Sequence, residues 1–181
     1  MRSLILPLAT AGATRFIFQF ESLFDSDDDQ SDVAVAIEKA IRIAHDIRIA
    51  GMRCGICISP NTAVEKIRPI LEAVYSEDNN NNNNSPLIEL VDILAVNPGI
   101  GGQQFNKDIL DKISQIRRNY PALPYIAVDG GINESTAQLA IDAGANILIA
   151  GSFVFGNNRS YSDGVFSLKE QLMKLIKICR F

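Results

Sequence analysis

The chain has 181 residues, 47% of them hydrophobic, which suffices to bury the core of one domain. Its net charge at pH 7 is −4 and it has no cluster of Lys and Arg, which excludes nucleic acid and anionic membranes as main partners. The single histidine, His45, excludes any metal or catalytic site that needs two histidines from this chain.

The sequence also bears on the cellular location of the protein. No apolar run reaches the roughly 18 residues that a bilayer span requires. The apolar start of the chain is interrupted at Pro7, which does not fit a signal peptide. Three cysteines are an odd number and do not suggest a secreted disulfide framework. We therefore predict a cytoplasmic protein, with an organellar location left open.

Helices that end at Ala-Gly and lead at once into an apolar strand recur along the chain, because glycine stops a helix by adopting the left-handed conformation. In chain order we predict the end of a helix at 4–11, a strand at 16–20, a helix at 33–50, a strand at 54–58, a helix at 62–74, a strand at 87–96, a helix at 108–120, a strand at 125–128, a helix at 135–143 capped by Asn133, a strand at 147–150 and a helix at 163–179. Continuously apolar strands that alternate with helices are typical of a parallel sheet covered by helices on both faces. The sequence therefore predicts an α/β fold.

Two polar segments interrupt this pattern. Residues 25–32 are acidic, and we interpret them as a solvated loop because they lack the spacing and the glycine of a calcium-binding loop. Residues 77–86 contain six consecutive asparagines and are predicted to be a disordered loop insertion. Neither segment separates two domains, so we predict one domain over residues 1–181.

Cys54 and Cys57 match the C-x-x-C spacing of redox proteins. Redox cysteines lie at a helix N-terminus, where the thiolate is stabilised, whereas this pair falls inside a predicted strand. Residues three apart on a strand point to opposite faces, so these thiols cannot readily pair. We predict two buried structural cysteines, and we place His45 on the surface of the helix at 33–50.

Three glycine-rich segments follow three of the predicted strands: Val96–Phe105, Val128–Gly131 and Ala150–Ser152. The carboxyl ends of the strands are where α/β enzymes hold their substrates. Glycine lets backbone N–H groups approach a ligand closely, and such groups bind anions. With Asp129 as the carboxylate among them, these segments predict one anion-binding site.

The same segments resemble the motifs of the ribulose-phosphate 3-epimerase family. Asn97–Phe105 is similar to the family's N/E-P-G-F-G-G-Q-x-F, and Val128–Ile132 is similar to its V-D-G-G-I/V. Ala143–Asn146 and Ala150–Ser152 resemble its A-G-A-N and A/S-G-S. The resemblance implies a (β/α)8 TIM barrel, of which this chain carries about five βα units, strands four to eight, and lacks the amino-terminal strands.

The resemblance also implies a reaction of the pentose phosphate pathway. D-ribulose 5-phosphate and D-xylulose 5-phosphate are interconverted at C3 through an enediolate, which two aspartates and a divalent metal cation support. Asp129 would be one of these aspartates, as acid/base and as metal ligand. The implied substrate- and phosphate-binding residues are Gly99, Ile100, Gly101, Gly102, Gly130, Gly131, Gly151 and Ser152.

Some positions depart from the family pattern. Gln19 stands where the fourth strand usually has histidine, and Leu94 where the sixth usually has methionine. The second aspartate and the histidine ligands have no counterpart in this sequence, so we expect little or no activity from this chain alone. We also expect a second copy or a partner chain to cover the open edges of the sheet, since unpaired edges promote aggregation.

Two other functions remain open at this stage. The chain could be a non-catalytic protein that binds sugar phosphate or associates with a complete epimerase. It could also be a different ketose-phosphate 3-epimerase.

Overall fold

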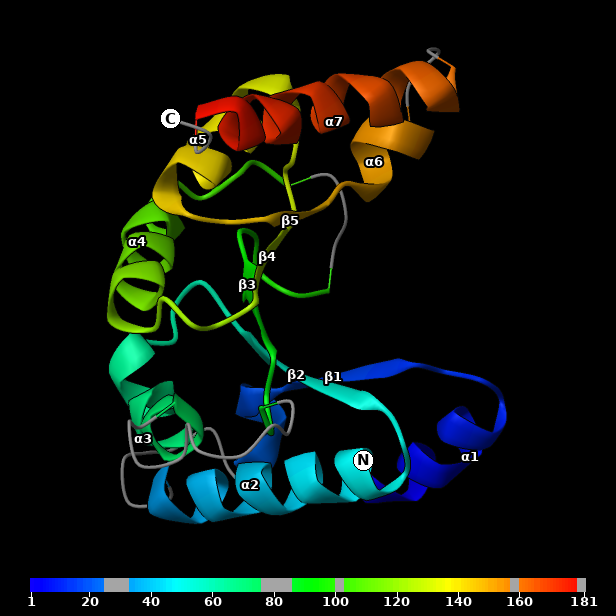
Figure 1. The fold of residues 1–181 in the computed structure, drawn as a ribbon, viewed down its shortest axis with the longest axis vertical. Helices are drawn as coiled ribbons and strands as arrows, with labels where there is room; N and C mark the ends of the chain where they lie inside the picture. The colour runs from blue at the N-terminus through cyan, green and yellow to red at the C-terminus, as the bar shows by residue number, and fades with distance from the viewer. Residues whose placement is uncertain (25–32, 76–85, 100–102, 157–159, 179–181) are drawn as a thin grey trace. The chain divides into compact units, whose positions relative to one another are not determined.

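The computed structural model describes residues 1–24, 33–75, 86–99, 103–156 and 160–178, with the backbone alone for residues 174–178. Within them, five strands form one sheet in the order β1-β2-β3-β4-β5 (Figure 1). The strands are β1 (Arg15–Gln19), β2 (Arg53–Ile58), β3 (Leu90–Leu94), β4 (Tyr125–Asp129) and β5 (Ile147–Ile149). β1 and β2 run parallel, with Phe16 opposite Cys54, and so do β4 and β5, with Ala127 opposite Ile147. The predicted parallel α/β fold is confirmed.

Helices alternate with these strands along the chain. They are η1 (Arg2–Leu4), α1 (Ile5–Thr10), η2 (Phe20–Leu23), α2 (Val33–Ile49), α3 (Val64–Tyr75), α4 (Ile109–Asn119), α5 (Glu134–Ala143), α6 (Gly151–Phe155) and α7 (Tyr161–Ile178). The longer helices lie where the sequence predicts them. η2 and α6 were not predicted, because helices of four and five residues are too short to show an apolar period.

The chain divides into two compact units. Unit 1 comprises Met1–Ile58, Thr62–Asp92 and Ala122–Pro124, and unit 2 comprises Ser59–Asn61, Ile93–Pro121 and Tyr125–Phe181. Strand β3 contributes its first residues to unit 1 and its last residues to unit 2. The interpretation of residues 1–181 as one partial TIM-barrel domain stays a prediction.

In unit 1, helix α2 packs on β2 and on η2. At helical spacing in the sequence, Ile37, Ile41, Ala44 and Arg48 trace one side of this helix, but of these only Ala44 is buried. The buried residues are Ala36, Ala40, Ile43, Ala44 and Ile47. Three alanines one turn apart form a flat surface that lets a helix approach its neighbours closely, whereas the pattern considered only where the larger apolar residues recur.

Cys54 and Cys57 lie in β2 and are buried, as predicted, and neither forms a disulfide bond. Burial raises the pKa of the Cys54 thiol to about 12, and the nearby charge of Arg48 opposes that rise. A thiol with so high a pKa holds almost no thiolate at neutral pH, which fits a structural role. His45 is exposed on α2, as predicted.

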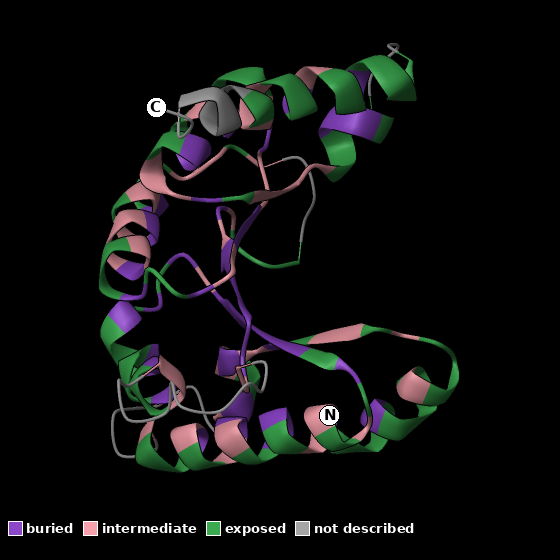
Figure 2. Ribbon diagram, viewed as in Figure 1, coloured by how far each residue is buried: buried purple, intermediate pink, exposed green. Residues whose placement is uncertain are grey.

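The edge strands are less buried than the inner strands (Figure 2). Most residues of β2, β3 and β4 are buried, whereas the residues of β5 are all partly exposed and Ile17 of β1 is 38% exposed. The expectation that every strand is buried on both faces therefore holds only for the three inner strands.

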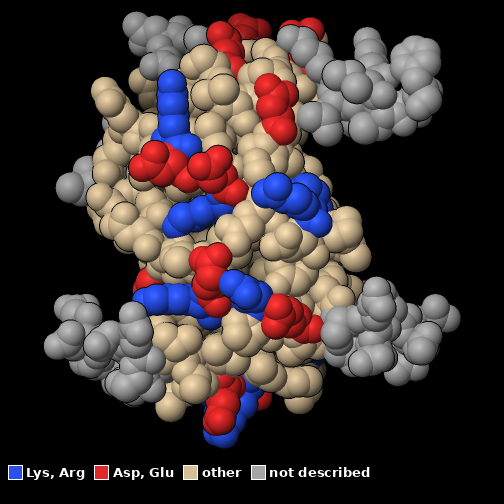
Figure 3. All heavy atoms as spheres, turned by 90° about the vertical axis from the view of Figure 1, so that its left-hand side faces the viewer, with Lys and Arg blue, Asp and Glu red and all other residues tan. Residues whose placement is uncertain are grey.

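Acidic and basic side chains lie next to one another on the surface that Figure 3 shows. Glu38 with Arg42 and Glu65 with Arg68 form ion pairs along their helices. Within the described residues, no helix combines the length and the apolar character that crossing a membrane requires. The predicted acidic loop at 25–32, nearly all of the predicted loop at 77–86, and Cys179 lie outside the described residues.

Candidate active site

Asp129 is the last residue of β4, and the backbone beyond it turns sharply. Its carbonyl oxygen accepts a hydrogen bond of 2.7 Å from the N–H of Ala95, which joins the end of β4 to the residue after β3. Gly130 and Gly131 follow with φ angles of 103° and 63°. Residues with a β-carbon rarely adopt such angles, so the turn after β4 depends on glycine.

Close contacts with neighbouring residues are a second reason why positions 130 and 131 require glycine. A β-carbon on Gly130 would overlap the side chain of Val96, and one on Gly131 would lie 2.6 Å from the backbone nitrogen of Phe105. Val96 and Phe105 belong to the loop that follows β3. The two loops therefore pack against each other at van der Waals distance, which fixes the carboxyl ends of β3 and β4 relative to each other within unit 2.

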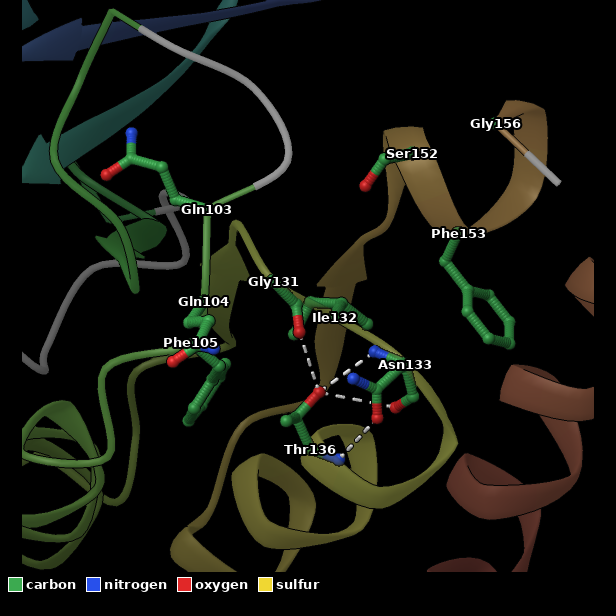
Figure 4. Close-up of a pocket in the computed structure, with 10 residues that line it drawn as sticks. All are labelled: Gln103, Gln104, Phe105, Gly131, Ile132, Asn133, Thr136, Ser152, Phe153 and Gly156. Carbon is green, nitrogen blue, oxygen red and sulfur yellow. Dashed lines mark hydrogen bonds between the residues drawn. The ribbon is translucent and has the colours of Figure 1, made fainter.

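The first turn of helix α5 is hydrogen-bonded to the glycine turn that follows β4 (Figure 4). Asn133 is the N-cap residue, as predicted, and its Oδ1 accepts hydrogen bonds from the N–H groups of Ser135 at 2.9 Å and Thr136 at 3.1 Å. The hydroxyl of Thr136 accepts a hydrogen bond from the N–H of Asn133 at 2.8 Å and donates one to the carbonyl of Gly131 at 2.9 Å. This capping box ties the glycine turn to the helix.

The loop after β3 is closed on itself by Gln103, whose Nε2 donates a hydrogen bond of 2.7 Å to the carbonyl of Asn97. Gly99 has a φ of 115°, and Asn106 returns to the strand end through a 2.8 Å bond to the carbonyl of Ala95. Ile100, Gly101 and Gly102, which the motif assigns to substrate binding, lie outside the described residues.

After β5, Ala150 caps α6, which places Gly151 and Ser152 in its first turn. Ser152 and Gly131 both line a pocket of about 500 Å³ in unit 2 (Figure 4). Its lining residues are Gln103, Gln104, Phe105, Gly131, Ile132, Asn133, Thr136, Ser152, Phe153 and Gly156. The pocket thus brings together residues from all three glycine-rich segments.

Some predicted residues are not part of the wall of this pocket. Gly99, Gly130, Gly151 and Asp129 are described but are not among its lining residues. The prediction of site residues did not include Thr136 and Phe153. The capping pattern Asn133 to Thr136 was a usable signal for Thr136, whereas Phe153 depends on the short helix α6, which the sequence did not reveal.

A model of the ribulose-phosphate 3 epimerase family matches residues 31–155 of the chain. The chain belongs to this family. It is 37% identical over 150 residues to a cytoplasmic isoform of ribulose-phosphate 3-epimerase from Oryza sativa subsp. japonica, an alignment that covers 83% of this chain and 55% of that protein. It is 33% identical over 167 residues to ribulose-phosphate 3-epimerase from Schizosaccharomyces pombe, covering 92% and 60%. The epimerase-family chain thus spans little more than half the length of these relatives.

A solved structure supports the fold of this family member. The crystal structure of orotidine 5'-monophosphate decarboxylase from Sulfolobus solfataricus matches 97% of this chain and 68% of its own, with a TM-score of 0.56 and 14% sequence identity. At that identity the likeness concerns the fold alone. It fits an architecture in which the five βα units of this epimerase-family chain are part of an α/β barrel.

The carboxyl group of Asp129, at the end of β4 in this epimerase-family chain, is half-buried. Burial raises its pKa above the ordinary value for aspartate, and a hydrogen bond from the N–H of Gly130 opposes that rise. A carboxylate whose pKa is raised is a stronger base than a solvated one, so Asp129 suits the removal of a proton from carbon better than a surface aspartate does.

The family resemblance implies a divalent cation. The described residues contain no group of three or more His, Cys, Asp and Glu side chains that could hold a metal ion. Asp129 offers one carboxylate, whereas a protein-bound divalent cation usually takes several protein ligands. The described residues therefore do not by themselves supply the ligand set of such a cation.

Proposed function

We propose that this chain carries the phosphate-binding part and one acid/base group of a ribulose-phosphate 3-epimerase site. The observation that carries the proposal is the glycine turn after β4, which follows Asp129 directly and lines a pocket together with Ser152. Family membership supports it, because the similar proteins from rice and fission yeast are named ribulose-phosphate 3-epimerases. The substrate would be a pentulose 5-phosphate.

The phosphate would bind to backbone N–H groups and to the hydroxyl of Ser152. Such groups suit a phosphate because they donate hydrogen bonds without adding charge that would also attract other anions. The residues proposed for substrate and phosphate binding are Gly99, Ile100, Gly101, Gly102, Gly130, Gly131, Gly151 and Ser152.

Asp129 would act on the carbon skeleton. The C3–H bond of a pentulose lies next to the C2 carbonyl, so its proton is weakly acidic. The Asp129 carboxylate would take this proton, and the electron pair of the broken bond would form the enediolate across C2 and C3. Epimerisation then requires a proton to be delivered to the opposite face of C3. One carboxylate cannot readily do both, so we expect this chain to exchange the C3 proton faster than it inverts C3.

Deuterium incorporation tests this chemistry directly. D-ribulose 5-phosphate would be incubated with the chain in D2O, with and without an added divalent cation, and C3 followed by NMR. We expect deuterium at C3 of ribulose 5-phosphate to exceed the xylulose 5-phosphate formed, and both to disappear in Asp129→Asn. Asp142→Asn, which removes the same charge from an exposed position on α5, is the matched control and should behave as the original chain does.

A second candidate function has its own supporting observation. The ten described residues that line the pocket are all uncharged, so the pocket can bind a phosphate without contributing an acid or a base. A non-catalytic chain that binds sugar phosphate, alone or with a complete epimerase, has the same pocket. Binding of ribulose 5-phosphate without any deuterium at C3 would favour this function over catalysis, and a panel of other ketose phosphates would test the substrate. A cytoplasmic location is part of the proposal.

A further inference from the structure

We propose that Thr136 is a positioning residue for the phosphate pocket, because its hydroxyl fixes the orientation of the peptide group between Gly131 and Ile132. This inference rests on the proposed function, since it assigns the pocket a phosphate. Thr136 is 9% exposed, lies one turn into α5 and reaches back across the turn that follows β4 (Figure 4).

The Thr136 hydroxyl has two strong hydrogen bonds of opposite kinds. It accepts from the N–H of Asn133 at 2.8 Å and donates to the carbonyl of Gly131 at 2.9 Å, with a longer contact of 3.4 Å to the carbonyl of Asn133. A hydroxyl can do both because it has one proton and two lone pairs. Serine retains this ability, whereas valine has nearly the shape of threonine and neither function.

The hydrogen bond from the Thr136 hydroxyl to the Gly131 carbonyl determines the direction of the next backbone N–H group, that of Ile132. The described residues contain no cis peptide bond, and in a trans peptide the C=O and N–H groups point in opposite directions. The Gly131 carbonyl points to Thr136, so the N–H of Ile132 points away from the first turn of α5. In Figure 4 this is the side on which Gln103 and Ser152 lie, and Ile132 is itself a lining residue.

The peptide group after Gly131 needs this hydrogen bond because glycine itself restricts its rotation so little. Because Gly131 has no β-carbon, rotation of the peptide that follows it is less restricted than after any other residue. A rotated peptide would turn the Gly131 carbonyl, with its partial negative charge, toward a bound phosphate. The Thr136 hydroxyl opposes this rotation through its bond to the Gly131 carbonyl, whereas its other bond, from the N–H of Asn133, belongs to the capping box of α5.

The test uses the full chain, inorganic phosphate as the probe, and NMR of Thr136→Val and Thr136→Ser. In the absence of phosphate, we expect Thr136→Val to change the carbonyl resonance of Gly131 and the amide resonance of Ile132, and Thr136→Ser to restore both. The dissociation constant for phosphate should rise at least about tenfold in Thr136→Val, as for the loss of one hydrogen bond to a charged group, and little in Thr136→Ser. Ser135→Ala, which removes an exposed hydroxyl next to Thr136, is the control and should bind phosphate as the original chain does.

The outcomes separate this inference from the proposed function. Unchanged Gly131 and Ile132 resonances in Thr136→Val would overturn the inference, as would equal weakening of phosphate binding by valine and serine. If the original chain binds no phosphate while the two resonances respond to valine and recover with serine, the proposed function fails and the positioning role stands. Amide resonances of Ala137 and Ile141 show whether α5 remains folded, and Thr136→Ala replaces valine if it does not.

Discussion

Gly131 combines a positive φ of 63° with a neighbouring backbone that leaves no room for a β-carbon. Half of the described positive-φ glycines, namely Gly12, Gly51 and Gly99, meet only the first condition. Gly12, for instance, has a φ of 95° and open space where a β-carbon would be. A comparison of Gly131 with Gly12 therefore separates the cost of conformational strain from the cost of steric overlap.

We expect Gly131→Ala to destabilise unit 2 by about 2–4 kcal/mol, because strain of roughly 1–2 kcal/mol adds to displacement of the Phe105 backbone. Gly12→Ala should cost only the strain, about 1–2 kcal/mol. Chemical denaturation followed by fluorescence and circular dichroism measures both. Equal losses of stability in the two variants would contradict the steric part of this prediction.

The raised pKa of Asp129 makes a prediction about stability as well as catalysis. Burial disfavours the charged carboxylate of Asp129 in the folded chain. The folded chain is therefore most stable while Asp129 is protonated, and it loses stability as the pH rises and this carboxyl group ionises. Asp129→Asn should therefore raise the melting temperature at pH 7. This advantage should disappear as the pH falls below the pKa of unfolded aspartate, where both states of the original chain are protonated. A melting-temperature difference that is independent of pH would contradict the assignment.

At the scale of single elements, a buried carboxylate joins the starts of three strands. Glu89 precedes β3 and is 6% exposed, and its Oε1 lies 2.7 Å from Nη2 of Arg15 and 3.7 Å from Nε of Arg53. Arg15 and Arg53 are opposite each other in the register of β1 and β2. Without the carboxylate, two like charges would face each other on neighbouring strands.

Glu89→Gln keeps the shape of the side chain and removes its charge, so we expect unit 1 to lose about 1–3 kcal/mol. The estimate is below that for a fully buried pair because the Arg53 side chain is 52% exposed. Glu38→Gln breaks an exposed pair on α2 and should change stability by less than about 0.5 kcal/mol. Urea denaturation midpoints compare the two variants, and similar midpoints would refute a special role for Glu89.

The elements also show which structural features a sequence reveals. The strand and helix around Asp129 could be predicted closely, because glycines, an N-cap and an apolar run are local signals. The buried side of α2 could not, because packing of Ala36 and Ala40 depends on partners far along the chain. The place of Thr136 in the pocket wall depends on how the turn folds back on α5, and the capping pattern from Asn133 to Thr136 indicates only that these two residues are close.

At the scale of the whole molecule, the two edge strands of the sheet are less buried than its inner strands. Within the described residues β1 and β5 are the end strands of the sheet, and each has one strand neighbour. An edge strand leaves backbone N–H and C=O groups available to another chain, and exposed apolar residues such as Ile17 increase that tendency. This is the physical basis for our proposal that a second copy or a partner chain covers the edges.

Amide hydrogen exchange at two protein concentrations tests this proposal. In dilute solution we expect the amides of β1 and β5 to exchange faster than those of β2, β3 and β4, because half-exposed edge strands open at a lower free energy than buried inner strands do. At high concentration we expect protection of β1 or β5 to increase, while that of the inner strands stays constant. Equal protection of edge and inner strands in dilute solution would mean that the edges are already covered within one chain, and would refute edge pairing between copies.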